Sequence, residues 1–130
     1  MLLDTSGLLA LLDPREPLHQ LARDRYAQAI TRVTHAFILA ELVALGIARG
    51  VPESHIVKFL MALLANPDIA TVWPDESLTS QAIALLTART GRGYSLCDAV
   101  SFMLMRTRGL NEALTTDQHF EDEGFVRLLK

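Results

Sequence analysis

Short apolar runs alternate with longer segments of helical periodicity along the whole chain, and this alternation constrains the fold more than any other feature of the sequence. A short apolar run is typical of a buried strand, whereas apolar residues at i, i+3 and i+4 share one face of a helix. Strands that are separated by helices are typical of parallel sheets with crossover connections. The sequence therefore predicts an α/β fold.

The predicted strands are all short, and several of the predicted helices end at glycine, which commonly follows the last turn of a helix. Strands are expected at Leu2–Asp4, Arg32–Thr34, Ala70–Val72, Ala113–Thr115 and near Phe125–Arg127. Helices are expected at Leu18–Ile30, Ala36–Arg49, from Val51-Pro52 to Asn66-Pro67, Glu76–Thr90, Leu96–Arg108 and, briefly, at Gln118-His119-Phe120.

The size and composition indicate one compact domain. A chain of 130 residues with 50% hydrophobic and 21% charged residues can bury one substantial core, so we expect a single domain over residues 1–130. The apolar start, Leu2–Leu12, is interrupted by Asp4 and Ser6 and is too short to span a bilayer. We therefore expect a cytoplasmic protein without a membrane partner. The single cysteine, Cys97, has apolar neighbours and is expected to pack in the core.

Four acidic residues interrupt apolar sequence, where ionised groups are costly unless a cation, a set of hydrogen bonds or a shifted pKa compensates them. None of the 12 lysines and arginines lies inside these segments. In a parallel sheet, the residues that follow the strands gather at one edge, so widely separated acids can meet there. The four candidate metal ligands are Asp4, Glu41, Asp98 and Asp117.

Each of these acids also has an ordinary structural interpretation. Asp117 could cap the short helix that follows it, and Asp98 could favour the positive end of its helix. Asp4 could occupy a strand-to-helix turn, and Glu41 could pair along its helix or point to solvent. The apolar neighbours of Glu41 leave little polar surface around it, so the joint occurrence of four such acids favours a metal site.

Carboxylate oxygens are suited to Mg²⁺ and Mn²⁺, and such an ion can assist phosphodiester hydrolysis by activating water and stabilising the leaving oxygen. The formal net charge of −3 becomes +1 when the four candidate ligands are left out, so a polyanionic partner is not excluded. Ten of the basic residues are arginines, but they are scattered along the chain. No arginine can be selected as an RNA contact from its spacing.

Other site chemistries lack their motifs. The four histidines form no i, i+4 pair and Cys97 has no cysteine partner, so a zinc site is not expected. His119 is the histidine nearest to the acids in sequence, and a surface or packing role is favoured for it over catalysis. The chain also has no glycine-rich phosphate loop and no Gly-x-Ser-x-Gly elbow, which argues against nucleotide-dependent and serine-hydrolase functions.

Four motifs in this order resemble those of the PIN-domain ribonucleases, and the resemblance covers essentially the whole chain. They are Leu2-Leu3-Asp4-Thr5-Ser6, Ala40-Glu41, Tyr94-Ser95-Leu96-Cys97-Asp98-Ala99-Val100-Ser101-Phe102 and Leu114-Thr115-Thr116-Asp117-Gln118-His119-Phe120. The chain is most similar to the VapC-type toxins of toxin-antitoxin pairs.

This resemblance implies a three-layer α/β/α fold with a mostly parallel sheet of about five strands, and RNA cleavage that depends on Mg²⁺ or Mn²⁺. It implies that the acidic pocket is formed by Asp4, Glu41, Asp98 and Asp117, with supporting hydroxyls from Thr5, Ser6 and Thr116. It further implies a homodimer that is held inactive by a small antitoxin protein.

Two other functions remain open at this point. The fold could serve as a noncatalytic module that binds RNA or protein, in which the acids only balance charge. An aspartate-based phosphatase or phosphoacceptor domain ranks last, because no second acid lies two positions after Asp4 and neither Lys58 nor Lys130 follows a suitable strand. The acids at Glu121, Asp122 and Glu123 are expected to form a solvated surface run, although one of them could be an extra ligand.

Overall fold

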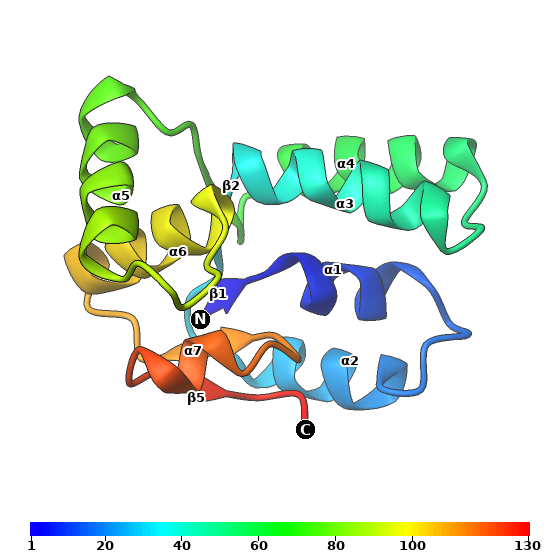
Figure 1. The fold of residues 1–130 in the computed structure, drawn as a ribbon. Helices are drawn as coiled ribbons and strands as arrows, with labels where there is room; N and C mark the ends of the chain where they lie inside the picture. Colours follow the sequence, from blue (N-terminus) through cyan, green and yellow to red (C-terminus); the bar gives the residue numbers. More distant parts are fainter.

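The computed structural model describes residues 1–130 and contains one sheet of five parallel strands with helices on both sides, a three-layer α/β/α fold (Figure 1). The strands are β1 (Leu2–Leu3), β2 (Val33–His35), β3 (Ala70–Val72), β4 (Glu112–Leu114) and β5 (Val126–Arg127). The helices are α1 (Thr5–Leu12), α2 (His19–Gln28), α3 (Ala36–Ala48), α4 (Glu53–Ala65), α5 (Glu76–Ala88), α6 (Leu96–Arg108) and α7 (His119–Asp122).

The predicted fold class is confirmed, and the predicted element boundaries differ by a few residues. The strand at Ala70–Val72 has the expected bounds, whereas the one expected at Arg32–Thr34 lies one residue later, at Val33–His35. The sequence prediction did not include α1, because its residues continue the apolar run of β1 without an alternating polar face. No helix of the structure is both long enough and apolar enough to cross a membrane.

The order of the strands, β3-β2-β1-β4-β5, places the first strand at the centre of the sheet. The chain extends the sheet from β1 through β2 to β3, and then crosses back to pair β4 with the other side of β1. In parallel sheets of this kind, ligands bind outside the carboxyl ends of the strands where the order reverses. That position lies between the ends of β1 and β4.

The centre of the sheet is completely buried. Leu2 and Leu3 of β1 have no exposed surface, nor do Ala113 and Leu114 of β4. In Figure 1, α1 lies between α3 and α2, whereas α5 and α6 pack together at the other end of the molecule. The buried strands thus form a rigid base for the residues that follow them.

One glycine allows α1 to approach the sheet closely. A Cβ atom on Gly7, in the first turn of α1, would lie 2.0 Å from the backbone oxygen of Leu114 in β4. No side chain fits in that space, so glycine is required for the start of α1 to contact the end of β4. This contact brings the residues after β1 next to those after β4.

Candidate metal centre

Asp4 is the first residue after β1 and is also the N-cap of α1. It is 6% exposed, and its Oδ2 accepts a hydrogen bond of 2.7 Å from the hydroxyl of Thr115. Burial raises the pKa of Asp4 to about 7, and although the Thr115 hydrogen bond opposes this rise, the nearby carboxylates of Asp98 and Asp117 add to it. A buried carboxyl with this pKa gains a proton readily unless a cation lies beside it.

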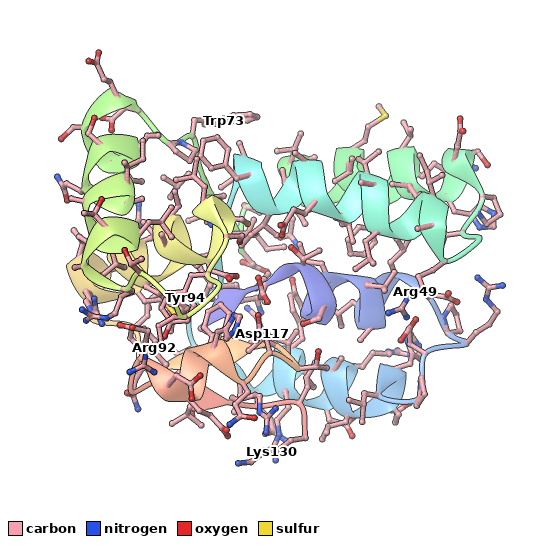
Figure 2. The ribbon with its side chains drawn as sticks, in the orientation of Figure 1. Arg49, Trp73, Arg92, Tyr94, Asp117 and Lys130 are labelled. Carbon is pink, nitrogen blue, oxygen red and sulfur yellow. The ribbon has the colours of Figure 1, made fainter.

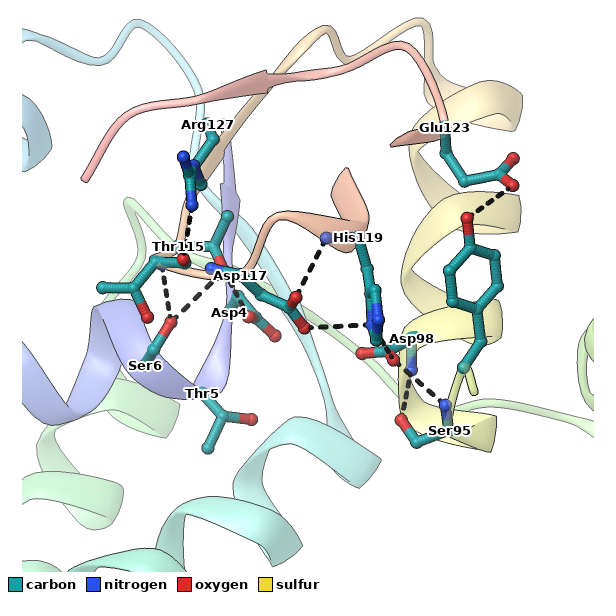
Figure 3. Close-up of polar contacts among 12 residues, drawn as sticks. Asp4, Thr5, Ser6, Ser95, Asp98, Thr115, Asp117, His119, Glu123 and Arg127 are labelled. Carbon is teal, nitrogen blue, oxygen red and sulfur yellow. Dashed lines mark hydrogen bonds and ion pairs between the residues drawn. The ribbon is translucent and has the colours of Figure 1, made fainter. Parts of the chain in front are cut away.

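A chain of hydroxyl groups connects the ends of β1 and β4. A hydroxyl has a single hydrogen, and because Thr115 donates its hydrogen to Asp4, Ser6 must donate in the 3.2 Å contact between Ser6 Oγ and Thr115 Oγ1. Ser6 Oγ in turn accepts the backbone N–H of Thr116, and Thr115 Oγ1 accepts that of Asp117 (Figure 3). These bonds fix the loop after β4 against the start of α1.

Asp98 and Asp117 are each held by a local hydrogen bond of the kind expected for a helix cap. Asp98 lies in the first turn of α6, where Ser95 Oγ accepts its N–H and its Oδ2 accepts the N–H of Ser95. Asp117 Oδ1 accepts the N–H of His119 at 2.9 Å. Burial raises the pKa of Asp98, and the hydrogen bond from Ser95 opposes the rise. Capping leaves other carboxylate lone pairs of both residues free for a ligand.

Glu41 reaches the site from α3. Its Oε2 accepts a hydrogen bond of 2.9 Å from the hydroxyl of Thr5. The apolar neighbours of Glu41 in sequence disfavoured a side chain that points to solvent, but the residue is exposed, because its side of α3 borders an open cleft. The structure corrects that expectation and still places Glu41 beside the other acids.

All four predicted acids line one open cleft of about 710 Å³. Figure 2 shows Asp117 near the middle of the molecule, where α1, α6 and α7 converge. The predicted supporting residues Thr5, Ser6 and Thr116 also line the cleft, together with Gly93, Ser95 and His119. A second cavity of about 570 Å³, between α1, α2 and α4, is lined mainly by apolar side chains and no carboxylates.

Two residues of the site were missed by sequence reasoning. Thr115 bonds directly to Asp4, whereas Thr116 contributes only backbone hydrogen bonds to this network. His119 places its Nδ1 3.4 Å from Asp98 Oδ2 and 3.5 Å from Asp117 Oδ2. The two-residue interval between Asp117 and His119 was visible in the sequence, but nothing there showed that Asp98 would approach the same ring.

Three acids follow Asp117 outside the cleft, and two of them, Glu121 and Glu123, are paired with basic residues, whereas Asp122 is exposed and unpaired. Glu123 accepts hydrogen bonds from Arg89, Arg106 and Tyr94, and its side chain is only 4% exposed, so the predicted solvated surface run is wrong for this residue. Glu121 pairs with Arg127 and Lys130. Neither glutamate is available as an extra ligand of the site.

Cys97 lies in the core beneath the cleft. It is 6% exposed, and burial together with the carboxylate of Glu41 raises the pKa of its thiol. The thiol therefore stays protonated, which agrees with the packing role that its apolar neighbours indicated.

Comparison with known proteins places this chain in a family. Residues 1–125 match the family model of the PIN domain. The chain belongs to the PIN-domain family. PIN domains are nucleases, so the resemblance that the sequence motifs indicated is confirmed at the level of the family.

The fold of this PIN domain is similar to that of a solved toxin structure. VapC20 of Mycobacterium tuberculosis, a sarcin-ricin loop cleaving toxin, superposes with a TM-score of 0.87 and 27% sequence identity. The match covers 96% of this chain and 95% of the VapC20 chain. No curated protein sequence matches the chain.

Proposed function

We propose that the protein is an endoribonuclease that hydrolyses RNA phosphodiester bonds with Mg²⁺ or Mn²⁺ held by Asp4, Glu41, Asp98 and Asp117. The observation that carries this proposal is that carboxylates from β1, α3, α6 and the loop after β4 line one open cleft. The membership of the PIN-domain family supports the same function.

The donor groups fit a hard divalent cation. Carboxylate and hydroxyl oxygens are the ligands that Mg²⁺ and Mn²⁺ prefer. None of the four carboxylates forms a salt bridge with a lysine or arginine, and the only basic group beside them is the imidazole of His119. The buried carboxyl of Asp4 and the neighbouring carboxylates of Asp98 and Asp117 therefore have no lysine or arginine to balance their negative charge. A bound divalent ion would supply that positive charge.

The residues of the chain hold the acids in place for this chemistry. A bound ion would lower the pKa of a water molecule and stabilise the leaving oxygen. Thr115 orients Asp4, Thr5 orients Glu41, and the Ser95 capping box orients Asp98. Hydrogen bonds of this kind keep ligating carboxylates in one orientation and thereby reduce the cost of binding the ion.

The proposed function also includes a class of RNA substrate, an antitoxin partner and a homodimeric state. The similarity to VapC20 makes an RNA hairpin of the sarcin-ricin type a rational first substrate. It also supports a role as the toxin of a toxin-antitoxin pair, as a single-domain, cytoplasmic homodimer that is inhibited by a small antitoxin. Sedimentation velocity on the purified protein tests the dimer, and co-purification with a protein encoded next to it tests the antitoxin.

The nuclease is tested by incubating hairpin and single-stranded RNA with wild type, Asp98→Asn and Asp68→Asn, in Mn²⁺, Mg²⁺ or EDTA. Asparagine keeps the size of Asp98 and its ability to accept from Ser95, so the fold should be retained. Asp68 is exposed, lies outside the cleft and serves as the matched control. We expect cleavage by wild type and Asp68→Asn that EDTA abolishes, and a loss of about 100-fold or more in Asp98→Asn.

Equal cleavage by folded Asp98→Asn, or cleavage that persists in EDTA, would contradict the proposal. The noncatalytic alternative predicts a different result, in which RNA is retained by the folded protein in a gel-shift assay and no product forms with either metal ion.

A further inference from the structure

The imidazole of His119 faces the two carboxylates that lie at the mouth of the cleft. Its Nδ1 is 3.4 Å from Asp98 Oδ2 and 3.5 Å from Asp117 Oδ2 (Figure 3). One atom of each of the three residues lies within 4.8 Å of the others. The sequence favoured a surface or packing role for His119, whereas the structure places its ring against the acids of the cleft.

The imidazole forms one hydrogen bond, from Nδ1 to Asp98 Oδ2, and at 3.4 Å this bond is long. Hydrogen bonds between an imidazole N–H and a carboxylate are typically about 2.7–2.9 Å long, and both contacts of Nδ1 exceed this length. The nitrogen is instead nearly equidistant from two oxygens of different residues. The three donor atoms lie within 4.8 Å of one another, and one cation placed between them could be reached by all three.

The ring is held where it is by contacts on two sides. The backbone N–H of His119 donates to Asp117 Oδ1 at 2.9 Å, which ties the residue to its neighbour in the site. The ring of Tyr94 packs edge-on against the imidazole with 4.9 Å between the ring centroids. The side chain is 32% exposed, and it lines the cleft with the acids. An imidazole restrained in this way loses little freedom when it binds an ion.

We propose that His119 Nδ1 is a ligand of the ion in this cleft, beside Asp98 and Asp117, and that the site therefore prefers Mn²⁺ to Mg²⁺. This inference rests on the proposed function, because it concerns the same cleft. Mg²⁺ binds oxygen almost exclusively, whereas transition-metal ions accept imidazole nitrogen together with carboxylates. The ligand nitrogen must carry no proton, which places the proton of neutral His119 on Nε2.

The decisive measurement is electron spin-echo envelope modulation of Mn²⁺ bound to the full-length, tag-free protein, because a coordinated imidazole gives a directly bonded ¹⁴N coupling. The variant His119→Phe keeps an aromatic ring against Tyr94 and removes the ligand atom, and His119→Gln serves as a second variant if the first is unstable. His55→Gln, an exposed histidine of α4, is the matched control. A polyhistidine tag must be absent because it supplies imidazole of its own.

We expect the ¹⁴N coupling in wild type and His55→Gln and its loss in His119→Phe. Calorimetric titration should show Mn²⁺ binding weakened about tenfold or more in His119→Phe, a loss of the size that changes near metal ligands produce, while Mg²⁺ binding weakens less. The preference for Mn²⁺ over Mg²⁺ should therefore decrease.

The two proposals fail in different ways. Mn²⁺ that binds wild type and is lost in Asp98→Asn, but shows no ¹⁴N coupling, would overturn the role of His119 and leave the metal site intact. Mn²⁺ that does not bind wild type at all, or that binds Asp98→Asn equally well, would overturn the proposed metal site and the His119 proposal with it.

Discussion

Thr115 donates a hydrogen bond of 2.7 Å to Asp4, across 111 positions of sequence, and so joins the residue after β1 to the residue after β4. Both residues are buried, and Thr115 has no exposed surface. The bond opposes the rise in the pKa of Asp4 that burial causes, because it favours the ionised carboxylate. In the proposed metal site, the ionised form of Asp4 near neutral pH thus depends on a hydroxyl from the residue after β4.

Replacing Thr115 by valine should raise the pKa of Asp4 further and weaken Mn²⁺ binding at pH 7 by about 10-fold to 100-fold, since a hydrogen bond to a charged group contributes about 1.5–3 kcal/mol. Mn²⁺ binding to wild type should weaken as the pH falls through about 7, and this transition should move to higher pH in the variant. Calorimetric titration between pH 6 and 9 measures both effects. Thr116→Val is the control and should match wild type, because the hydroxyl of Thr116 forms no hydrogen bond. If Mn²⁺ binding changed at the same pH in all three proteins, the influence of Thr115 on the pKa of Asp4 would be excluded.

The buried histidine of β2 makes stability sensitive to acid. Burial lowers the pKa of His35 to about 4, and its Nε2 pairs with Ser101 Oγ at 2.8 Å. The ordinary value of about 6.5 applies in the unfolded chain, so the stabilisation by neutral His35 is complete above pH 6.5 and is lost as the pH falls through 4. Over this window wild type should lose on the order of 3 kcal/mol relative to His35→Gln.

Urea unfolding of wild type, His35→Gln and His55→Gln at several pH values between 4 and 7 measures this difference. The exposed His55 should contribute nothing to it. A stability difference between wild type and His35→Gln that does not change with pH would show that His35 is not held in its neutral form by the fold.

Alanine at Gly7 should separate α1 from β4. Its Cβ would meet the backbone of Leu114, which cannot move aside as a flexible side chain can. We expect a loss of about 3 kcal/mol or more in the free energy of unfolding, together with weaker Mn²⁺ binding because Ser6 and Thr115 are displaced. Gly46→Ala is the matched control, because its Cβ would meet only the side-chain end of Ile56 at 2.8 Å. Comparable losses in the two variants, measured by urea unfolding, would contradict this account.

Neutralising Glu123 should destabilise the junction of α5, α6 and α7. Burial alone would raise the pKa of Glu123, but the hydrogen bonds from Arg89, Arg106 and Tyr94 together lower it, so the residue is ionised at neutral pH. Glu123→Gln removes the charge that Arg89 and Arg106 share, and because both arginines are more than a third exposed, the change should cost about 1–2 kcal/mol in chemical unfolding. Glu121→Gln, at a more exposed ion pair, should cost clearly less than Glu123→Gln, and equal losses of stability in the two variants would contradict this account.

Local signals in the sequence predicted much of the fold. The helix at Leu96–Arg108 has the predicted bounds, because Ser95 and Asp98 form a capping box at its start and Gly109 adopts a left-handed conformation at its end. The strand at Ala70–Val72 also has the predicted bounds. Helix α1 was missed because its apolar residues face buried surroundings on several sides and leave no clear periodicity.

The sequence by itself determined which acids are candidates, since Asp4, Asp98 and Asp117 follow or begin recognisable elements and Glu41 interrupts an apolar helix. Only the tertiary structure decided which other groups meet them. The pairing of β1 with β4, with Leu3 opposite Leu114, brings Thr115 to Asp4, and the packing of α6 beside α7 brings His119 to Asp98. These contacts join residues that are 111 and 21 positions apart. They depend on strand order and register, which long-range packing sets and local sequence does not encode.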